Sequence, residues 1–179
     1  MTEESRDNVI NVLVGGRKEG KSSTVADYII PAALAQGKAV FLCQPKWNPA
    51  YIKYEADTRI KFLVTGDIDE IMKLVKNVYN ACVIIEEEYV YFDDSLPKEV
   101  KVMIINTGQQ NVDMHFIGHN YTWVCKDLYR IANVFTIMRC GESPRARQGN
   151  TGFTADEVLF IEKGLKDLPK YKHFILQRT

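Results

Sequence analysis

Residues 15–22, GGRKEGKS, have the types and spacing of a turn that binds phosphate groups. They match the pattern G-x-x-x-x-G-K-[ST] at every position. The glycines let the main chain approach phosphate oxygens closely, and successive backbone N–H groups form a concave anion site. We expect Lys21 to lie between the β- and γ-phosphates of a nucleotide and Ser22 to offer its hydroxyl to Mg²⁺. The expected nucleotide-binding residues are Gly15, Gly16, Arg17, Lys18, Glu19, Gly20, Lys21, Ser22 and Ser23.

Two carboxylates directly follow the most apolar segment of the chain. Residues 82–85 are CVII, and Glu86 and Glu87 come next. In phosphate-loop NTPases an acidic residue that ends a buried strand serves the metal side of the site. We therefore expect Glu86 to hold Mg²⁺ through water, and Glu87 to orient the attacking water or accept its proton. A solvated acidic turn is the alternative, because negative charge continues from Glu88 to Asp94.

A third group of polar side chains ends the apolar segment of residues 114–118. His119 and Asn120 follow this segment directly. A hydrogen-bonding group there, one strand away from the phosphate loop, would lie near the γ-phosphate and respond to its loss. We expect His119 to take this catalytic role, whereas His115, inside the apolar segment, is expected to be structural.

The elements that must position these residues alternate along the chain. Short apolar runs are separated by segments with apolar residues at helical spacing, which is typical of βαβ units and a mostly parallel sheet with helices on both faces. Such sheets bind ligands beyond the carboxyl ends of their strands. The expected strands are residues 9–14, 39–43, 61–65, 81–85, 114–118, 134–138 and 173–177. The expected helices are residues 21–36, 68–79, 98–107, 127–132 and 155–166.

Composition excludes several other classes of protein. Hydrophobic residues make up 46% and charged residues 26% of the 179 positions, so wholesale disorder is excluded. The four cysteines lie far apart with no Cys-x-x-Cys pair, which argues against a zinc ribbon or a disulfide framework. No apolar run reaches the roughly 18–20 residues that span a bilayer. We expect one domain over residues 1–179, with a core at about 8–139 and a basic loop, helix and strand at 140–179.

The order of these motifs resembles that of a known group of motors. The phosphate loop, residues 83–87 and residues 107–119 (TGQQNVDMHFIGH) together look like the FtsK/HerA group of P-loop motor ATPases. Within that group the chain is most similar to the genome-packaging ATPases of icosahedral viruses that have double-jelly-roll coats and internal membranes. The resemblance covers about residues 9–139.

This resemblance implies a three-layer α/β/α P-loop NTPase fold of the additional-strand type. It also implies ATP and Mg²⁺ as cofactors, and ATP hydrolysis that translocates double-stranded DNA into a preformed capsid. The implied partners are double-stranded DNA, further copies in a ring, usually a hexamer, and a capsid or membrane vertex protein. The protein would then be found in the host cytoplasm or with the virion, and would not be secreted. By position, Lys21 and Ser22 bind nucleotide and metal, Glu86 and Glu87 form the acidic pair, and His119 is the sensor.

One position departs from the family pattern. The turn that often carries an arginine has Gln109 here, so an arginine supplied to a neighbouring subunit must come from elsewhere. Residues 125–179 hold ten Lys and Arg against six Asp and Glu, a net charge of +4 in a chain of zero net charge. The loop at 139–149 suits phosphate clamping or a neighbour's nucleotide, and a merely solvated basic loop is the alternative. The candidate arginines are Arg130, Arg139, Arg145 and Arg147.

Two other functions remain open from the sequence. A nucleotide or small-molecule kinase would also combine a phosphate loop with an arginine-bearing loop. A nucleotide-gated phage assembly ATPase would need no DNA. The pair of glutamates favours water over an organic hydroxyl as the acceptor.

Overall fold

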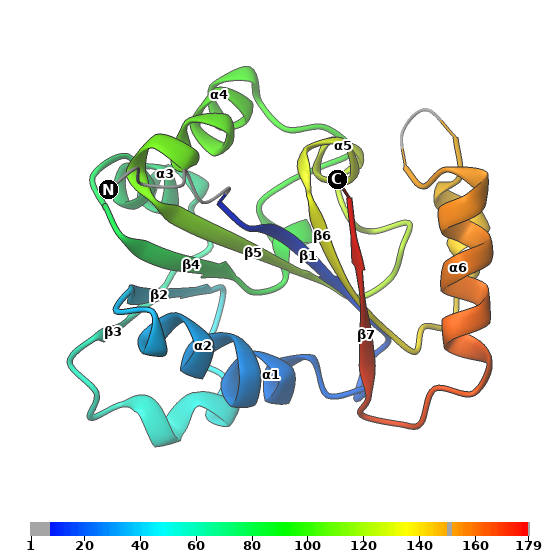
Figure 1. Cartoon of the computed structure of the whole chain (residues 1–179). Coiled ribbons are helices and arrows are strands. Elements are labelled where there is room, and N and C mark those ends of the chain that lie inside the picture. Colours follow the sequence, from blue (N-terminus) through cyan, green and yellow to red (C-terminus); the bar gives the residue numbers. More distant parts are fainter. Residues whose placement is uncertain (1–7, 150–151, 179) are drawn as a thin grey trace, which may run out of the picture.

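A seven-stranded sheet organises the protein. The computed structural model describes residues 8–149 and 152–178 (Figure 1). The strand order is β3-β2-β4-β5-β1-β6-β7. Every pairing is parallel except that of β7 with β6, which is antiparallel. The strands are β1 (Ile10–Val14), β2 (Ala39–Gln44), β3 (Ile60–Val64), β4 (Ala81–Ile85), β5 (Val112–Gly118), β6 (Val134–Met138) and β7 (His173–Gln177).

Helices cover both faces of this sheet. One face carries α1 (Lys21–Thr24), the π-helical η1 (Val25–Ile29), α2 (Ile30–Ala35) and the 3₁₀ turn η2 (Pro49–Tyr54). The other face carries α3 (Ile68–Lys76), α4 (Lys98–Asn106), α5 (Lys126–Ile131) and α6 (Ala155–Lys166). Short 3₁₀ turns are η3 (Glu88–Val90), η4 (Thr107–Gln110) and η5 (Pro144–Arg147). Among the described residues, no helix combines the length and apolar character needed to span a bilayer.

Side chains of the central strands alternate between two cores. In β4, Val83 and Ile85 pack with α3–α6, whereas Cys82 and Ile84 pack with α1–α2. A strand buried on both faces must be apolar throughout, which explains the continuous apolar runs in the sequence. The expected three-layer α/β/α fold is confirmed.

The expected helix at residues 21–36 is interrupted by a π-helical segment. Pro31 has no backbone N–H, so it cannot donate the α-helical bond to residue 27. The backbone widens to π geometry over η1, immediately before this proline, and then continues as α2. The turn η2 was not expected, and it follows β2 directly into the region of the candidate site.

Strand β5 lies between β1, which leads into the phosphate loop, and β4, which leads into the acidic residues. This inserted strand is the additional strand of the expected fold type. The end of β5 therefore lies between the phosphate loop, which follows β1, and the residues Glu86 and Glu87, which follow β4.

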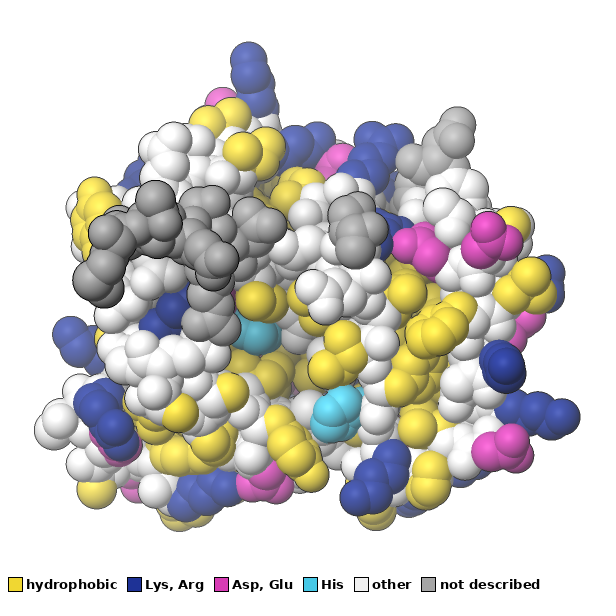
Figure 2. Space-filling model, in the orientation of Figure 1, with side chains coloured by type: hydrophobic (Ala, Val, Ile, Leu, Met, Phe, Trp, Pro, Cys, Tyr) yellow, Lys and Arg dark blue, Asp and Glu magenta, His cyan; other side chains and the backbone are white. Residues whose placement is uncertain are grey.

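The C-terminal part of the chain joins the same sheet through β7 and α6. The rings of Phe160 on α6 and Phe174 on β7 lie 5.9 Å apart, and Figure 2 shows hydrophobic side chains gathered over these two elements. A Cβ on Gly164 would lie 2.8 Å from Cζ of Phe174, so only glycine allows this close approach. The turn before β7 is thereby fixed at the same edge of the sheet as the phosphate loop.

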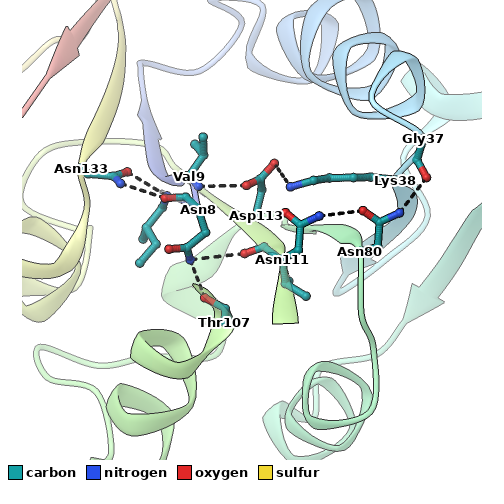
Figure 3. Close-up of polar contacts among 11 residues, drawn as sticks. Asn8, Val9, Gly37, Lys38, Asn80, Thr107, Asn111, Asp113 and Asn133 are labelled. Carbon is teal, nitrogen blue, oxygen red and sulfur yellow. Dashed lines mark hydrogen bonds and ion pairs between the residues drawn. The ribbon is translucent and has the colours of Figure 1, made fainter. Parts of the chain in front are cut away.

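A polar network ties the strands together at the opposite, amino-terminal edge (Figure 3). Lys38 Nζ lies 2.6 Å from Asp113 Oδ2, and the two side chains are only 3% and 11% exposed. The other oxygen of Asp113 accepts a bond from the backbone N–H of Val9 at 2.9 Å. Asn111 donates to Asn80 at 2.8 Å. These bonds connect the segments that enter β1, β2, β4 and β5.

Removing one partner of the buried pair should destabilise the whole sheet. We expect Lys38→Met to lower the free energy of unfolding by about 3–5 kcal/mol, because Asp113 keeps a buried charge without its cation. Urea denaturation measures this change. The control is Lys53→Met, whose ion pair with Asp27 is exposed to solvent and screened, so its loss should change the free energy of unfolding far less. Equal effects in the two variants would contradict the assigned role.

Candidate functional site

The phosphate-binding motif forms the loop between β1 and α1. Gly16 N–H donates to the carbonyl of Arg139 at 2.7 Å, which fixes the loop against the end of β6. A Cβ on Gly15 would lie 2.7 Å from the Cβ of Met138, so this glycine is required by close approach. Gly20 has φ of 94°, a left-handed conformation that glycine adopts without strain. The loop therefore has the strand–turn–helix setting that the motif needs.

Lys21 lies at the centre of the site. Its ammonium donates to the carbonyls of Gly15 and Gly16, each at 2.8 Å, and lies 2.9 Å from Nδ1 of His119. Burial lowers the pKa of Lys21 to about 8, while the nearby charge of Glu86 acts in the opposite direction. The ammonium thus connects the phosphate loop to the end of β5.

His119 lies between Lys21 and Glu87. Because the ammonium donates to Nδ1, the neutral ring carries its hydrogen on Nε2. That nitrogen lies 3.6 Å from Oε1 of Glu87. Burial, and then the charge of Lys21, lower the pKa of His119 and favour the neutral ring. The ring is also flanked by Tyr89 and Trp123, with centroids 5.6 and 6.4 Å away.

The two residues expected at the metal lie together and are held from η2. The Tyr51 hydroxyl donates to Glu86, and Asn48 donates to the Ser22 hydroxyl at 3.0 Å. Burial raises the pKa of Glu86, and hydrogen bonds from Tyr51 and Ser22 act against that rise. A hydroxyl and a carboxylate in mutual contact form an all-oxygen donor set, which fits Mg²⁺. Tyr51 and Asn48 were not predicted, because nothing local in the sequence marks a contact from the loop after β2.

Glu87 points into the same cavity as Glu86 because the chain turns at this residue. Its φ of 52° is left-handed and ends the extended strand. The Tyr89 hydroxyl donates to its Oε2 at 3.3 Å. The cavity measures about 220 Å³. It is lined by Lys18, Gly20, Lys21, Ser22, Asn48, Glu86, Glu87, Ile117 and His119.

The alternative of a solvated acidic turn does not describe Glu88. Its side chain is fully buried behind the site, and neither oxygen has a hydrogen-bond partner among the described residues. Burial raises the pKa of Glu88 to about 8. A carboxyl group in that environment stays largely protonated at neutral pH.

Three of the four candidate arginines are engaged within their own chain. Arg147 is buried and donates to the carbonyls of Tyr121 at 2.9 Å and Val124 at 3.1 Å. Arg145 makes two bonds of 2.7 Å to the carboxylate of Glu162. Arg147 therefore holds the segment after β5, a role that sequence reasoning did not anticipate.

The third engaged residue, Arg130, and the remaining candidate, Arg139, have exposed side chains, as Arg145 does. Arg139 follows β6 directly and lies beside the phosphate loop of its own chain. Arg130 lies on α5, with Nη1 3.8 Å from Asp127 Oδ1. Gln109, at the turn where the resembled family often has an arginine, lies in η4 immediately before β5 and hence at the amino-terminal edge, far from this chain's phosphate loop.

No family model matches the sequence, and no curated protein matches it. Solved structures do. The genome packaging NTPase B204 from Sulfolobus turreted icosahedral virus 2, in complex with ATP-γS, matches with a TM-score of 0.72 and 19% identity over 96% of this chain and 92% of that chain. The DNA-packaging ATPase B204 from Sulfolobus turreted icosahedral virus matches with a TM-score of 0.67 and 13% identity over 95% and 93%.

A more distant match is the N-terminal domain of zonular occludens toxin from Neisseria meningitidis. Its TM-score is 0.51 at 12% identity, over 97% of this chain and 95% of that chain. At these identities the similarity shows the fold alone. The chain has a P-loop NTPase fold, and the expected resemblance to viral genome-packaging ATPases is confirmed at the level of the fold.

Glu88 generates a pH-dependent prediction. The folded protein retains this proton up to about pH 8, against 4.5 for an ordinary glutamate, so its stability falls as the pH rises through that window. Glu88→Gln has no proton to lose. We therefore expect the variant to gain at least about 2 kcal/mol in free energy of unfolding relative to the unaltered protein between about pH 5 and pH 8.5. Urea denaturation at both pH values measures this, and a pH-independent difference would contradict it.

Proposed function

We propose that this protein is an ATP-hydrolysing motor that translocates double-stranded DNA and packages a viral genome into a preformed capsid. One observation carries the hydrolytic part of the proposal. The phosphate loop, the acidic pair Glu86 and Glu87, and His119 converge on one cavity at the carboxyl ends of β1, β4 and β5. The structural likeness to viral packaging NTPases supports the motor part.

In the proposed reaction, the loop of residues 15–23 binds the phosphates of ATP through its backbone N–H groups, except those of Gly15 and Gly16, which donate to the carbonyls of Gly118 and Arg139. The Lys21 side chain moves, so that its ammonium leaves the loop carbonyls and binds the β- and γ-phosphates. Ser22 and Glu86 would hold Mg²⁺, which would supply charge neutralisation at the transferring phosphate. Glu87 accepts the proton of the attacking water as a general base.

His119 links these events. While Lys21 donates to Nδ1, the ring is held at the loop with its N–H directed at Glu87. Once the ammonium binds phosphate, Nδ1 loses this donor and the ring is able to turn. The orientation of Glu87 thereby becomes dependent on the presence of the γ-phosphate.

We propose that the protein works as a homo-oligomeric ring, by the resemblance a hexamer. A ring would repeat the +4 charge of residues 125–179 around a pore, which reconciles DNA binding with zero net charge. The proposed site takes an arginine from the neighbouring subunit. The candidates are Arg130, Arg139 and Arg145, which are exposed, whereas Arg147 is buried and donates to backbone carbonyls. A vertex protein of the capsid or membrane is the proposed further partner, in the virion or the host cytoplasm.

A kinase is the second candidate, and a specific observation favours it. A cavity of about 630 Å³ adjoins the phosphate loop, and Gln44, Trp47 and Glu87 are among its lining residues. The buried Gln44 amide nitrogen has no hydrogen-bond partner among the described residues. A nucleoside or other phosphate acceptor bound in this cavity would lie beside Glu87. A motor needs no such acceptor, because it transfers the phosphate to water.

Two variants test the proposed hydrolysis. Lys21→Ala should abolish ATP binding, because the charge between the phosphates is lost. Glu87→Gln should bind ATP normally but release phosphate about 10²–10⁴-fold more slowly, because the general base is lost. Calorimetry measures binding, and phosphate release measures turnover, on protein sized by light scattering.

The controls separate the three functions. Double-stranded DNA should stimulate phosphate release if the protein is a motor, and should have no effect on an assembly ATPase. Phosphate that appears on a nucleoside or nucleotide instead of in water would identify a kinase. Hydrolysis by Glu87→Gln at the unaltered rate would contradict the assignment of the base.

A further inference from the structure

The strand order sets the direction of a nucleotide in the loop. Glu86 and Glu87 follow β4 and His119 follows β5, so these groups lie on one side of β1. Strands β6 and β7 lie on the other side. Because the γ-phosphate must face the acidic pair, the nucleoside end must extend toward β6 and β7. This step rests on the proposed function.

The turn that enters β7 lies on this nucleoside side. Strand β7 runs antiparallel to β6, and its first residue, His173, pairs with Met138, the last residue of β6. Residues 169–172 therefore lie at the carboxyl edge of the sheet, next to the phosphate loop. This turn carries an aromatic residue, Tyr171.

Tyr171 contacts the phosphate loop but is not part of a core. A Cβ on Gly20 would lie 3.2 Å from Cδ1 of Tyr171, so the ring edge rests against this glycine. The residue is nevertheless 59% exposed. Its φ of 65° is left-handed, an uncommon conformation for a bulky side chain.

A lysine side chain lies over the ring of Tyr171. Lys170 Nζ lies 4.9 Å from the ring centroid, a cation–π arrangement at the surface. A nucleobase is a flat aromatic group of suitable size to replace that ammonium. Lys170 would then be free to turn toward the phosphates.

We propose that Tyr171 is the stacking platform for the base of the bound nucleoside triphosphate. Stacking is tolerant of base identity, so the residue provides affinity for the nucleoside and does not select adenine. The platform belongs to the C-terminal segment that α6 and β7 attach to the sheet. Nucleoside binding would thus depend on a part of the chain outside the recognised motifs.

Two ligands separate stacking from phosphate binding. Calorimetry is performed on the full chain with the ATP analogue AMPPCP and with inorganic tripolyphosphate, both with Mg²⁺. We expect Tyr171→Ala to weaken AMPPCP binding by about 5- to 100-fold and to leave tripolyphosphate binding unchanged. Tyr171→Phe should retain the affinity for AMPPCP. The matched control is Tyr79→Ala, which removes a 70% exposed tyrosine at the amino edge of the sheet and should change neither affinity.

Three results would overturn the inference. If Tyr171→Ala binds AMPPCP as the unaltered protein does, the base does not stack there. If both ligands weaken equally, Tyr171 supports the loop through Gly20 and not the base. If the unaltered protein binds neither ligand, nucleotide binding itself fails, and this inference fails with it.

Discussion

The Lys21 ammonium is the interaction on which the rest of the site depends. A buried cation is costly unless it is hydrogen-bonded, and Lys21 meets this requirement with two loop carbonyls and His119. These bonds close the phosphate loop on itself and attach it to the end of β5. Through the His119 ring they also reach Glu87. In the proposed reaction, phosphate would compete with these acceptors for one charge, which would give the site a second arrangement.

Strand β5 makes this connection possible. It lies between β1 and β4, so it separates the phosphate loop from the acidic pair. His119, which follows β5, lies in the space between the loop and these carboxylates. The register of these strands is fixed at the other edge, where Asp113 at the start of β5 pairs with Lys38 and bonds Val9. A shift of register at that edge would move His119 away from both Lys21 and Glu87. The amino-terminal network thus fixes the register of the strands whose opposite ends carry the candidate site.

The sequence predicts the parts of this structure that depend on local pattern. Apolar runs predict the strands, and residues 15–22 predict the loop because glycine spacing specifies a backbone shape. The contacts of Tyr51 with Glu86 and of Arg147 with backbone carbonyls join distant segments, and no local signal marks them. The burial of Glu88 was missed because the two residues before it, Glu86 and Glu87, are also acidic and suggest an exposed turn. Pro31 is visible in the sequence, but the helical spacing around it predicted one continuous helix and not the π-helical segment before it.

The central claim is that ATP hydrolysis at this site moves double-stranded DNA. The displacement of a third strand from a DNA triplex measures such movement directly, because the motor must travel along the duplex to remove it. We expect displacement that requires ATP and Mg²⁺ and is lost in Glu87→Gln. If the unaltered protein hydrolyses ATP in the presence of this DNA while the third strand stays bound, the claim of translocation is contradicted.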